Sequence, residues 1–301
     1  MKRVLLTGAH GYIGRYMLDD LVARGYEVHA ISRRIPATAD DKAVWHATDL
    51  LDTAATKALT SELSATHLMH LAWVTEPGVY WQWPQNYEWL SASSNLLRSF
   101  AEHGGTRAVL AGTCAEYDWT DGHCVEDETP LRAKSLYAET KLAFREAALS
   151  LAKSADLNVA WARVFFSFGP HERPERLVPS VIRALLAGER AKCSDGSLLR
   201  DFMYVPDVAG AMVAVLDSDF VGDINIASGK PVTLAEIVNR IALRLDAADR
   251  VDFNHYPRRP DDPQKITADI SRLNDAIGWM PGYDLDSAID KTIAWWKIQV
   301  A

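Results

Sequence analysis

The stretch Thr7-Gly8-Ala9-His10-Gly11-Tyr12-Ile13-Gly14 decides the fold, because it separates an apolar run at 3–7 from a stretch of helical spacing at 12–24. Glycines here permit a tight turn, close approach of the backbone to a pyrophosphate, and close packing of the helix on the strand. The N-terminus of the helix adds N–H donors for an anion. The turn therefore predicts dinucleotide binding. A tight turn without a ligand is the alternative, and the position between a strand and a helix makes it the weaker one.

The N-terminal half of the chain alternates short apolar runs with longer amphipathic stretches, which is the pattern of βαβ units and a parallel sheet. Strands are expected at 3–7, 27–31, 67–72, 106–112 and 157–165, and helices at 12–24, 52–64, 86–103 and 134–153. We therefore expect an α/β protein with a Rossmann-type, doubly wound parallel sheet over 1–165, to which 201–227 return. Beyond it, prolines and charges interrupt the alternation, and we expect 166–301 to be mainly a smaller substrate-binding region.

Composition excludes several classes of protein. The 301 residues are 48% hydrophobic and 24% charged, which is ordinary globular composition, and a formal net charge of −8 disfavours nucleic acid as a partner. Cys114, Cys124 and Cys193 form no CxxC pair, so we expect no metal site, no disulfide framework and a reducing, cytoplasmic setting. Because 18 apolar residues never run together, we expect no membrane span.

The end of the second strand predicts which cofactor is preferred. An acid about 20 residues past the glycine turn would hold the ribose hydroxyls of NAD. This chain has Ser32-Arg33-Arg34 there, and a hydroxyl with two guanidinium groups can accept a 2′-phosphate instead. We therefore expect NADP(H) in preference to NAD(H). The alternative is that both arginines are solvated loop charges.

Tyr137 and Lys141 lie four residues apart in a predicted helix, so their side chains share one face. A cation there stabilises the phenolate and lowers the pKa of Tyr137 from about 10 toward the working pH. The alternative is a surface tyrosine stacked on a lysine stem. Thr113 ends the preceding strand, where ligands of parallel sheets bind, so its hydroxyl is placed to bind a substrate oxygen. A threonine that ends a strand for its β propensity is the alternative.

These motifs, with their GxxGxxG spacing and Tyr-xxx-Lys pair, resemble the extended branch of the short-chain dehydrogenase/reductases, the NAD(P)-dependent epimerase/dehydratase family of sugar-nucleotide enzymes. The resemblance implies catalytic roles for Thr113, Tyr137 and Lys141. With the residue-level arguments it gives these cofactor contacts: Gly8, Gly11, Tyr12, Ile13, Gly14, Ser32, Arg33, Arg34, Asp49, Leu50, Leu71, Ala72, Tyr137 and Lys141.

The resemblance also implies a substrate half. It assigns the nucleotide diphosphate to Arg200 and Arg259, although Arg200 could instead pair with Asp207 inside the protein. Phe166 stands where many family members have the asparagine of an Arg-x-Phe-Asn motif, and Thr113 should bind the substrate as well. Family dehydratases follow the threonine with an Asp-Glu pair, whereas this chain has Cys114-Ala115, which disfavours dehydration.

The sequence therefore predicts an NADPH-dependent 4-ketoreductase of a nucleotide-activated 4-keto-6-deoxy sugar, acting as a homodimer. Two alternatives stay open: an NAD-dependent nucleotide-sugar 4-epimerase and a non-catalytic NADP-binding sensor. Sensors usually lose the Tyr/Lys pair, which this chain keeps. Segment 73–89 is rich in Trp and Tyr; we expect core or lid packing for most of these rings, with one or two lining the substrate cleft.

Overall fold

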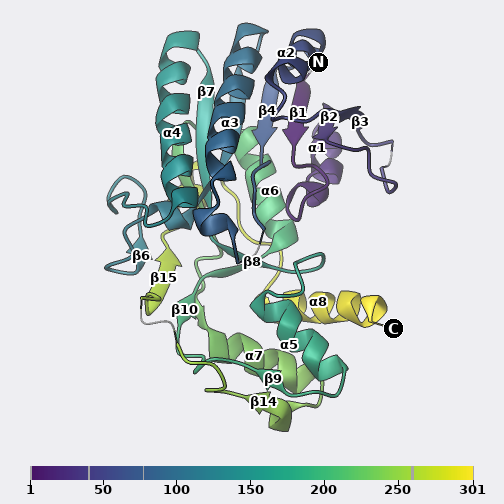
Figure 1. The fold of residues 1–301 in the computed structure, drawn as a ribbon, viewed down its shortest axis with the longest axis vertical. Helices are drawn as coiled ribbons and strands as arrows, with labels where there is room; N and C mark the ends of the chain where they lie inside the picture. Colours follow the sequence, from purple (N-terminus) through teal and green to yellow (C-terminus); the bar gives the residue numbers. More distant parts are fainter. Residues whose placement is uncertain (1, 40, 77, 259–260, 301) are drawn as a thin grey trace.

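A seven-stranded parallel sheet forms the centre of the protein (Figure 1). The computed structural model describes residues 2–39, 41–76, 78–258 and 261–300. The strands, in the order in which they lie side by side, are β12 (Gly222–Ile226), β7 (Asn158–Val164), β5 (Arg107–Thr113), β4 (His67–His70), β1 (Lys2–Thr7), β2 (Tyr26–Ser32) and β3 (Val44–Ala47). The order reverses between β1 and β4, which is where ligands bind in sheets of this kind. This is the predicted Rossmann-type, doubly wound fold.

Helices cover both faces of the sheet because alternate residues of each strand point to opposite sides. Val4 and Leu6 of β1 pack in one apolar cluster with α1 (Leu18–Ala23) and α6 (Val205–Leu216). Leu5, between them, packs on the other face in a cluster with residues of α2 (Thr53–Leu63), α3 (Gln85–Glu102) and α4 (Leu136–Ala155). All three strand residues are fully buried.

The predicted helix at 12–24 is the main local difference. The structure has a 3₁₀ turn, η1 (Gly14–Tyr16), followed by the short α1, so the chain does not enter a continuous helix at Tyr12. Residues 8–13 are used for the turn itself, in which the Gly11 N–H donates to the Gly8 carbonyl oxygen at 2.8 Å. The other predicted strands and helices agree with the structure to within a few residues at their ends.

The C-terminal part contributes to two places. Its α6 and β12 lie on the large sheet, where β12 pairs with β7. The π-helix η5 (Arg272–Ala276) also packs on the large sheet, through the fully buried Leu273. The remaining elements form small sheets and a helical layer beyond the carboxyl ends of the large sheet's strands (Figure 1). They are β8 (Phe166–Phe168), α5 (Leu177–Leu186), β9 (Ala191–Lys192), β10 (Leu199–Arg200), β11 (Phe202–Tyr204), β13 (Val232–Thr233), α7 (Leu234–Arg244), η4 (Ala248–Arg250), β14 (Val251–Asp252), β15 (Lys265–Ala268) and α8 (Leu285–Gln299).

Three short elements complete the chain: η2 (Tyr80–Gln82), η3 (Cys114–Glu116) and β6 (His123–Cys124). Within the described ranges, none of the helices is both long and apolar enough to cross a membrane. The same residues contain no group of three or more His, Cys, Asp or Glu side chains that could hold a metal ion.

Candidate active site

The catalytic residues expected from the sequence meet at the carboxyl end of β5. Thr113 is the last residue of β5, and Tyr137 lies in the first turn of α4, whose start is fixed by a hydrogen bond from the Ala138 N–H to the Ser135 hydroxyl. Tyr137 is 9% exposed. Burial raises the pKa of its phenol well above the ordinary value, while a hydrogen bond from the Thr113 hydroxyl lowers it. The two hydroxyl groups thus lie together.

Lys141 lies one turn further along α4 and is almost completely buried. Its Nζ donates a hydrogen bond to the carbonyl oxygen of Ala111 at 2.9 Å and lies 3.9 Å from the ring centroid of Trp73. Burial lowers the pKa of Lys141 to about 7. Among the described contacts, none joins this ammonium group to the Tyr137 hydroxyl. Burial dominates the pKa of the Tyr137 phenol, and Lys141 is not among the main groups that lower it.

Glu116 is a site residue that sequence reasoning missed. Its Oε1 accepts the Thr113 N–H at 2.8 Å, and its Oε2 accepts from Trp161 Nε1 at 2.9 Å and Arg163 Nε at 2.7 Å. Burial raises the pKa of Glu116, and the Arg163 charge opposes that shift. The spacing of Thr113 and Glu116, a capping box, was the available signal. Both oxygens of Glu116 have partners, so it holds Thr113 in place and is not a free acid or base.

Cys114 and Ala115 offer no acid–base pair either. Cys114 is 7% exposed, and burial raises the pKa of its thiol. Its thiol stays protonated and packs as a small apolar side chain. The site therefore lacks the paired carboxyl groups that elimination of water would use.

The glycine turn fits a dinucleotide. Gly8 has φ of 72°, and a Cβ added there would lie 3.1 Å from the Ala72 nitrogen. The backbone N–H groups of Tyr12 and Ile13 have no hydrogen-bond acceptor among the described residues. Leu71 and Ala72 follow β4 and donate their N–H groups to the Thr7 hydroxyl at 3.1 and 3.2 Å, which places them against the turn. Unpartnered backbone N–H donors at a glycine turn are what a pyrophosphate needs.

Gly14→Ala should weaken both the fold and cofactor binding. A Cβ at Gly14 would lie 2.3 Å from the Gly8 carbonyl oxygen, so the backbone of the turn must shift. We expect a loss of about 1–3 kcal/mol in the free energy of unfolding, measured with urea, together with weaker binding of nicotinamide dinucleotides. Gly210→Ala in α6 is the control, since its nearest contact is an ordinary 3.6 Å. Equal stability of the two variants would show that the turn can relax.

Ser32 is the last residue of β2, and Arg33 and Arg34 follow it directly. Both arginines are exposed, and they are the only arginines of the described residues that make no hydrogen bond, ion pair or ring contact to another described residue. The Thr48 N–H donates to the Ser32 carbonyl oxygen at 2.9 Å, which brings the segment after β3 alongside. In that segment the Asp49 carboxylate accepts the Leu51 N–H at 3.1 Å. Leu50 is buried.

The predicted substrate residues Phe166 and Arg200 lie together. The Arg200 guanidinium is 5.5 Å from the Phe166 ring centroid and its Nη2 lies 2.6 Å from Asp262 Oδ1. The pairing with Asp207 considered above is wrong, because the Asp207 carboxylate accepts the N–H groups of Gly282 and Tyr283 instead. Arg259 lies outside the described residues.

The aromatic rings of segment 73–89 differ in burial and in what they contact. Trp73 is 9% exposed and packs in the core, as expected for most of these rings, but Trp81, Trp83 and Tyr87 are exposed, so half of the six rings are not in the core. Tyr80 and Trp81 of η2 stack on each other and lie against Tyr137, with ring centroids 5.0 and 5.8 Å from its ring. These two rings form an aromatic wall beside the Tyr137 phenol.

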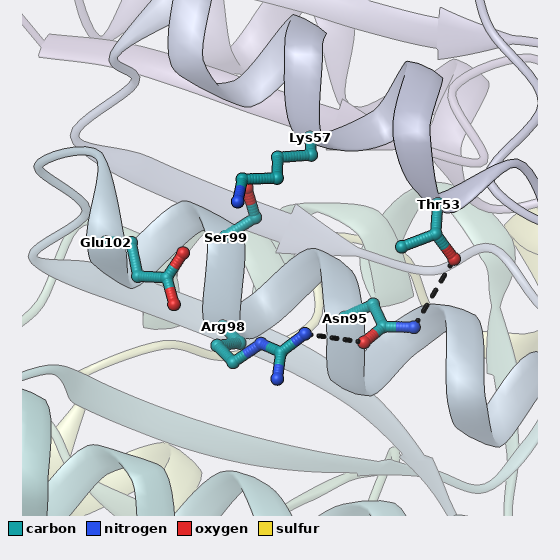
Figure 2. Close-up of a pocket in the computed structure, with 6 residues that line it drawn as sticks. All are labelled: Thr53, Lys57, Asn95, Arg98, Ser99 and Glu102. Carbon is teal, nitrogen blue, oxygen red and sulfur yellow. Dashed lines mark hydrogen bonds between the residues drawn. The ribbon is translucent and has the colours of Figure 1, made fainter.

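Two surface hollows lie away from Thr113 and Tyr137. One, of about 310 Å³, lies between α2 and α3 (Figure 2) and is lined by Thr53, Lys57, Asn95, Arg98, Ser99 and Glu102. Figure 2 shows Arg98 hydrogen-bonded to Asn95, which reaches Thr53. The other, of about 220 Å³, lies behind the Glu116–Arg163 pair and is lined partly by Arg145, Arg163 and Asp223. Neither contains a predicted catalytic residue.

The fold and the site together define a class: a Rossmann-type protein with a glycine turn at the switch point of its sheet and a Tyr/Lys pair on the helix after β5. The chain belongs to the NAD dependent epimerase/dehydratase family, whose model matches residues 4–227. A UDP-glucuronic acid decarboxylase 1 of Danio rerio is 25% identical over 98% of this chain and 73% of its own length. A dTDP-6-deoxy-L-talose 4-dehydrogenase (NAD(+)) of Aggregatibacter actinomycetemcomitans is 26% identical over 87% and 98%. The UDP-glucose 4-epimerase of Thermus thermophilus, solved with NAD, has a TM-score of 0.86 and 27% identity over 98% and 99% of the two chains.

Proposed function

We propose that the protein reduces the 4-keto group of a nucleotide-activated 4-keto-6-deoxy sugar with NADPH. The observation that supports this most is the pairing of Thr113 and Tyr137 at the carboxyl end of β5. We place the cofactor on 1–165 with 201–227, and the substrate mainly on the rest of 166–301. Formation of a homodimer stays a prediction.

Thr113 and Tyr137 would hold the carbonyl oxygen of the sugar between their hydroxyl groups. The raised pKa of Tyr137 keeps its phenol protonated at neutral pH, and a protonated phenol is the acid that reduction requires. Oxidation in the reverse direction would require the phenolate. When bound, the nicotinamide cofactor supplies the hydride, and Tyr137 gives its proton to the resulting oxygen. Glu116 keeps Thr113 in register by holding its backbone N–H.

Support for NADP(H) comes from Arg33 and Arg34. They have no partner among the described residues, and guanidinium groups match the oxygens of a 2′-phosphate. The Tyr12 and Ile13 N–H groups would face the pyrophosphate. The similar Thermus epimerase was solved with NAD, so the dissociation constants of both cofactors test this preference directly.

The relatives support chemistry at C4 of a nucleotide sugar. One is named a 4-dehydrogenase of a 6-deoxy sugar, whose reverse reaction is reduction of the 4-keto group. The similarity to a UDP-glucose 4-epimerase supports a second candidate, an epimerase that cycles through the 4-keto sugar on a retained cofactor. The third alternative, a non-catalytic sensor, is disfavoured because Thr113, Tyr137 and Lys141 are all present, with Tyr137 and Lys141 buried and Thr113 partly buried.

Purified protein should oxidise one NADPH for each 4-keto-6-deoxy sugar nucleotide supplied, measured as the loss of NADPH absorbance with the sugar nucleotide as the limiting reactant. It should not interconvert 4-epimers without added cofactor, because a reductase releases its oxidised cofactor. A panel of UDP-, dTDP-, GDP- and CDP-sugars tested by thermal shift identifies the base, since a bound ligand stabilises the folded state. Epimerisation without added cofactor would overturn the reductase proposal in favour of the epimerase.

A further inference from the structure

Lys141 is a cation almost without polar partners. It is 2% exposed, and its Nζ makes one hydrogen bond to a described residue, the 2.9 Å bond to the Ala111 carbonyl oxygen. A buried ammonium group that keeps its charge needs compensation from its surroundings. No described carboxylate forms an ion pair with it, and Glu116 acts on it only from a distance. The remaining contact is the face of the Trp73 indole, 3.9 Å from the Nζ.

The Trp73 ring is fixed in that place. Its Nε1 donates to Oδ1 of Asn86 at 2.8 Å, and Asn86 is fully buried. The Asn86 Nδ2 donates in turn to the carbonyl oxygens of Tyr80 and Trp83, at 2.7 and 2.8 Å. One buried amide therefore ties the ring over Lys141 to the segment that forms the aromatic wall beside Tyr137. Phe144, 6.2 Å away between ring centroids, packs against the same indole.

We propose that Trp73 is a positioning residue, whose indole face, anchored by Asn86, holds the Lys141 ammonium group beside the active site and keeps it charged. The inference rests on the proposed function in one respect, namely that the charge of Lys141 assists Tyr137 in the reaction. Holding a buried cation on an aromatic face is a property of the folded chain itself, and it can be tested without cofactor or substrate.

Besides the Ala111 carbonyl oxygen, the Trp73 ring is the short-range stabiliser of the Lys141 ammonium group among the described residues. Glu116 of η3 raises the pKa of Lys141, whereas burial lowers it to about 7. His70 of β4 is neutral at working pH, because burial lowers its pKa to about 3, and its ring lies between the Thr7 and Ser93 hydroxyls. Tyr137 is protonated. A desolvated cation–π contact favours the charged form by about thirtyfold, or about 1.5 pH units.

The test compares urea unfolding of the cofactor-free protein at pH 6 and pH 8.5 in wild type and Trp73→Leu. At pH 8.5 Lys141 is mostly neutral in both folded proteins. Because burial lowers the pKa of Lys141 below that of the unfolded chain, both proteins lose stability as the pH falls from 8.5 to 6. The folded wild type recovers part of this loss by protonating Lys141 near pH 7, whereas the variant, whose Lys141 pKa lies lower still, recovers little. The effect of Trp73→Leu on the unfolding equilibrium constant should therefore be about tenfold larger at pH 6. Trp73→Phe keeps an aromatic face over Lys141. Its effect on the unfolding equilibrium constant should therefore depend much less on pH than that of Trp73→Leu.

Two controls separate this role from simple packing. In a Lys141→Met background, the penalty of Trp73→Leu should be the same at both pH values. Trp296→Leu should also give a pH-independent penalty, because Trp296 is equally buried but its cationic neighbour is Arg183, which stays charged throughout. If Trp73→Leu does not fold, Trp73→Met takes its place, because the longer, flexible methionine side chain adapts better to an irregular space. A Trp73 penalty that is equal at pH 6 and pH 8.5, or that keeps its pH dependence with Met at position 141, would overturn the proposal.

Discussion

Tyr137→Phe is expected to lower kcat for reduction of the 4-keto sugar by about 100-fold or more, the usual contribution of a general acid. The substitution removes the phenol oxygen and keeps the ring, so the contacts with Tyr80 and Trp81 remain. Steady-state kinetics measure the loss. Binding of the dinucleotide, measured by fluorescence titration, should change little, because the glycine turn is untouched.

Tyr87→Phe is the matched control, since its ring lies on α3 and is 61% exposed. It should reduce the substrate at the wild-type rate. A Tyr137→Phe enzyme with undiminished turnover would remove Tyr137 from the proposed chemistry. Loss of dinucleotide binding along with turnover would instead indicate that the phenol holds the cofactor.

The double variant Arg33→Ser, Arg34→Ser is expected to bind NADPH about tenfold to hundredfold more weakly for each lost contact, while NADH binding hardly changes. Only NADPH has the 2′-phosphate, and each lost charge-assisted hydrogen bond costs about 1.5–3 kcal/mol. Ser32→Asp should go further and invert the preference, because a carboxylate repels the phosphate and accepts the ribose hydroxyls of NADH. Titrations of both cofactors give the dissociation constants.

Arg190→Ser provides the control, because Arg190 is an exposed arginine whose partner is the carbonyl oxygen of Asp249. It should leave both constants unchanged. The wild-type preference for NADPH should also shrink as salt rises, since exposed charges are screened. Equal wild-type affinities, or tighter binding of NADH, would refute the NADP(H) proposal and strengthen the 4-epimerase candidate.

The sequence by itself determined the large sheet and the local motifs. Consecutive apolar residues such as Val4, Leu5 and Leu6 predict a strand that is buried on both sides, because successive side chains point to opposite faces. Tyr137 and Lys141 share a helix face because a spacing of four fixes their separation before any tertiary contact forms. The glycine turn could also be predicted from the sequence. Gly8 has a backbone conformation that favours glycine, and the backbone at Gly14 lies close to that of Gly8, a neighbour in the chain. Among the predicted helices and strands, only the start of the first helix was wrong.

Contacts between distant segments were decided by the tertiary structure alone. Glu116 meets Arg163 across 47 positions, and Trp73, in the segment after β4, covers Lys141 of α4. Arg200 pairs with Asp262 and not with Asp207, although the latter is much nearer in sequence. A short spacing fixes the distance between two side chains through backbone geometry. Partners that lie on separate elements are chosen by how the helices pack on the sheet, and that packing depends on the whole core, which no local pattern records.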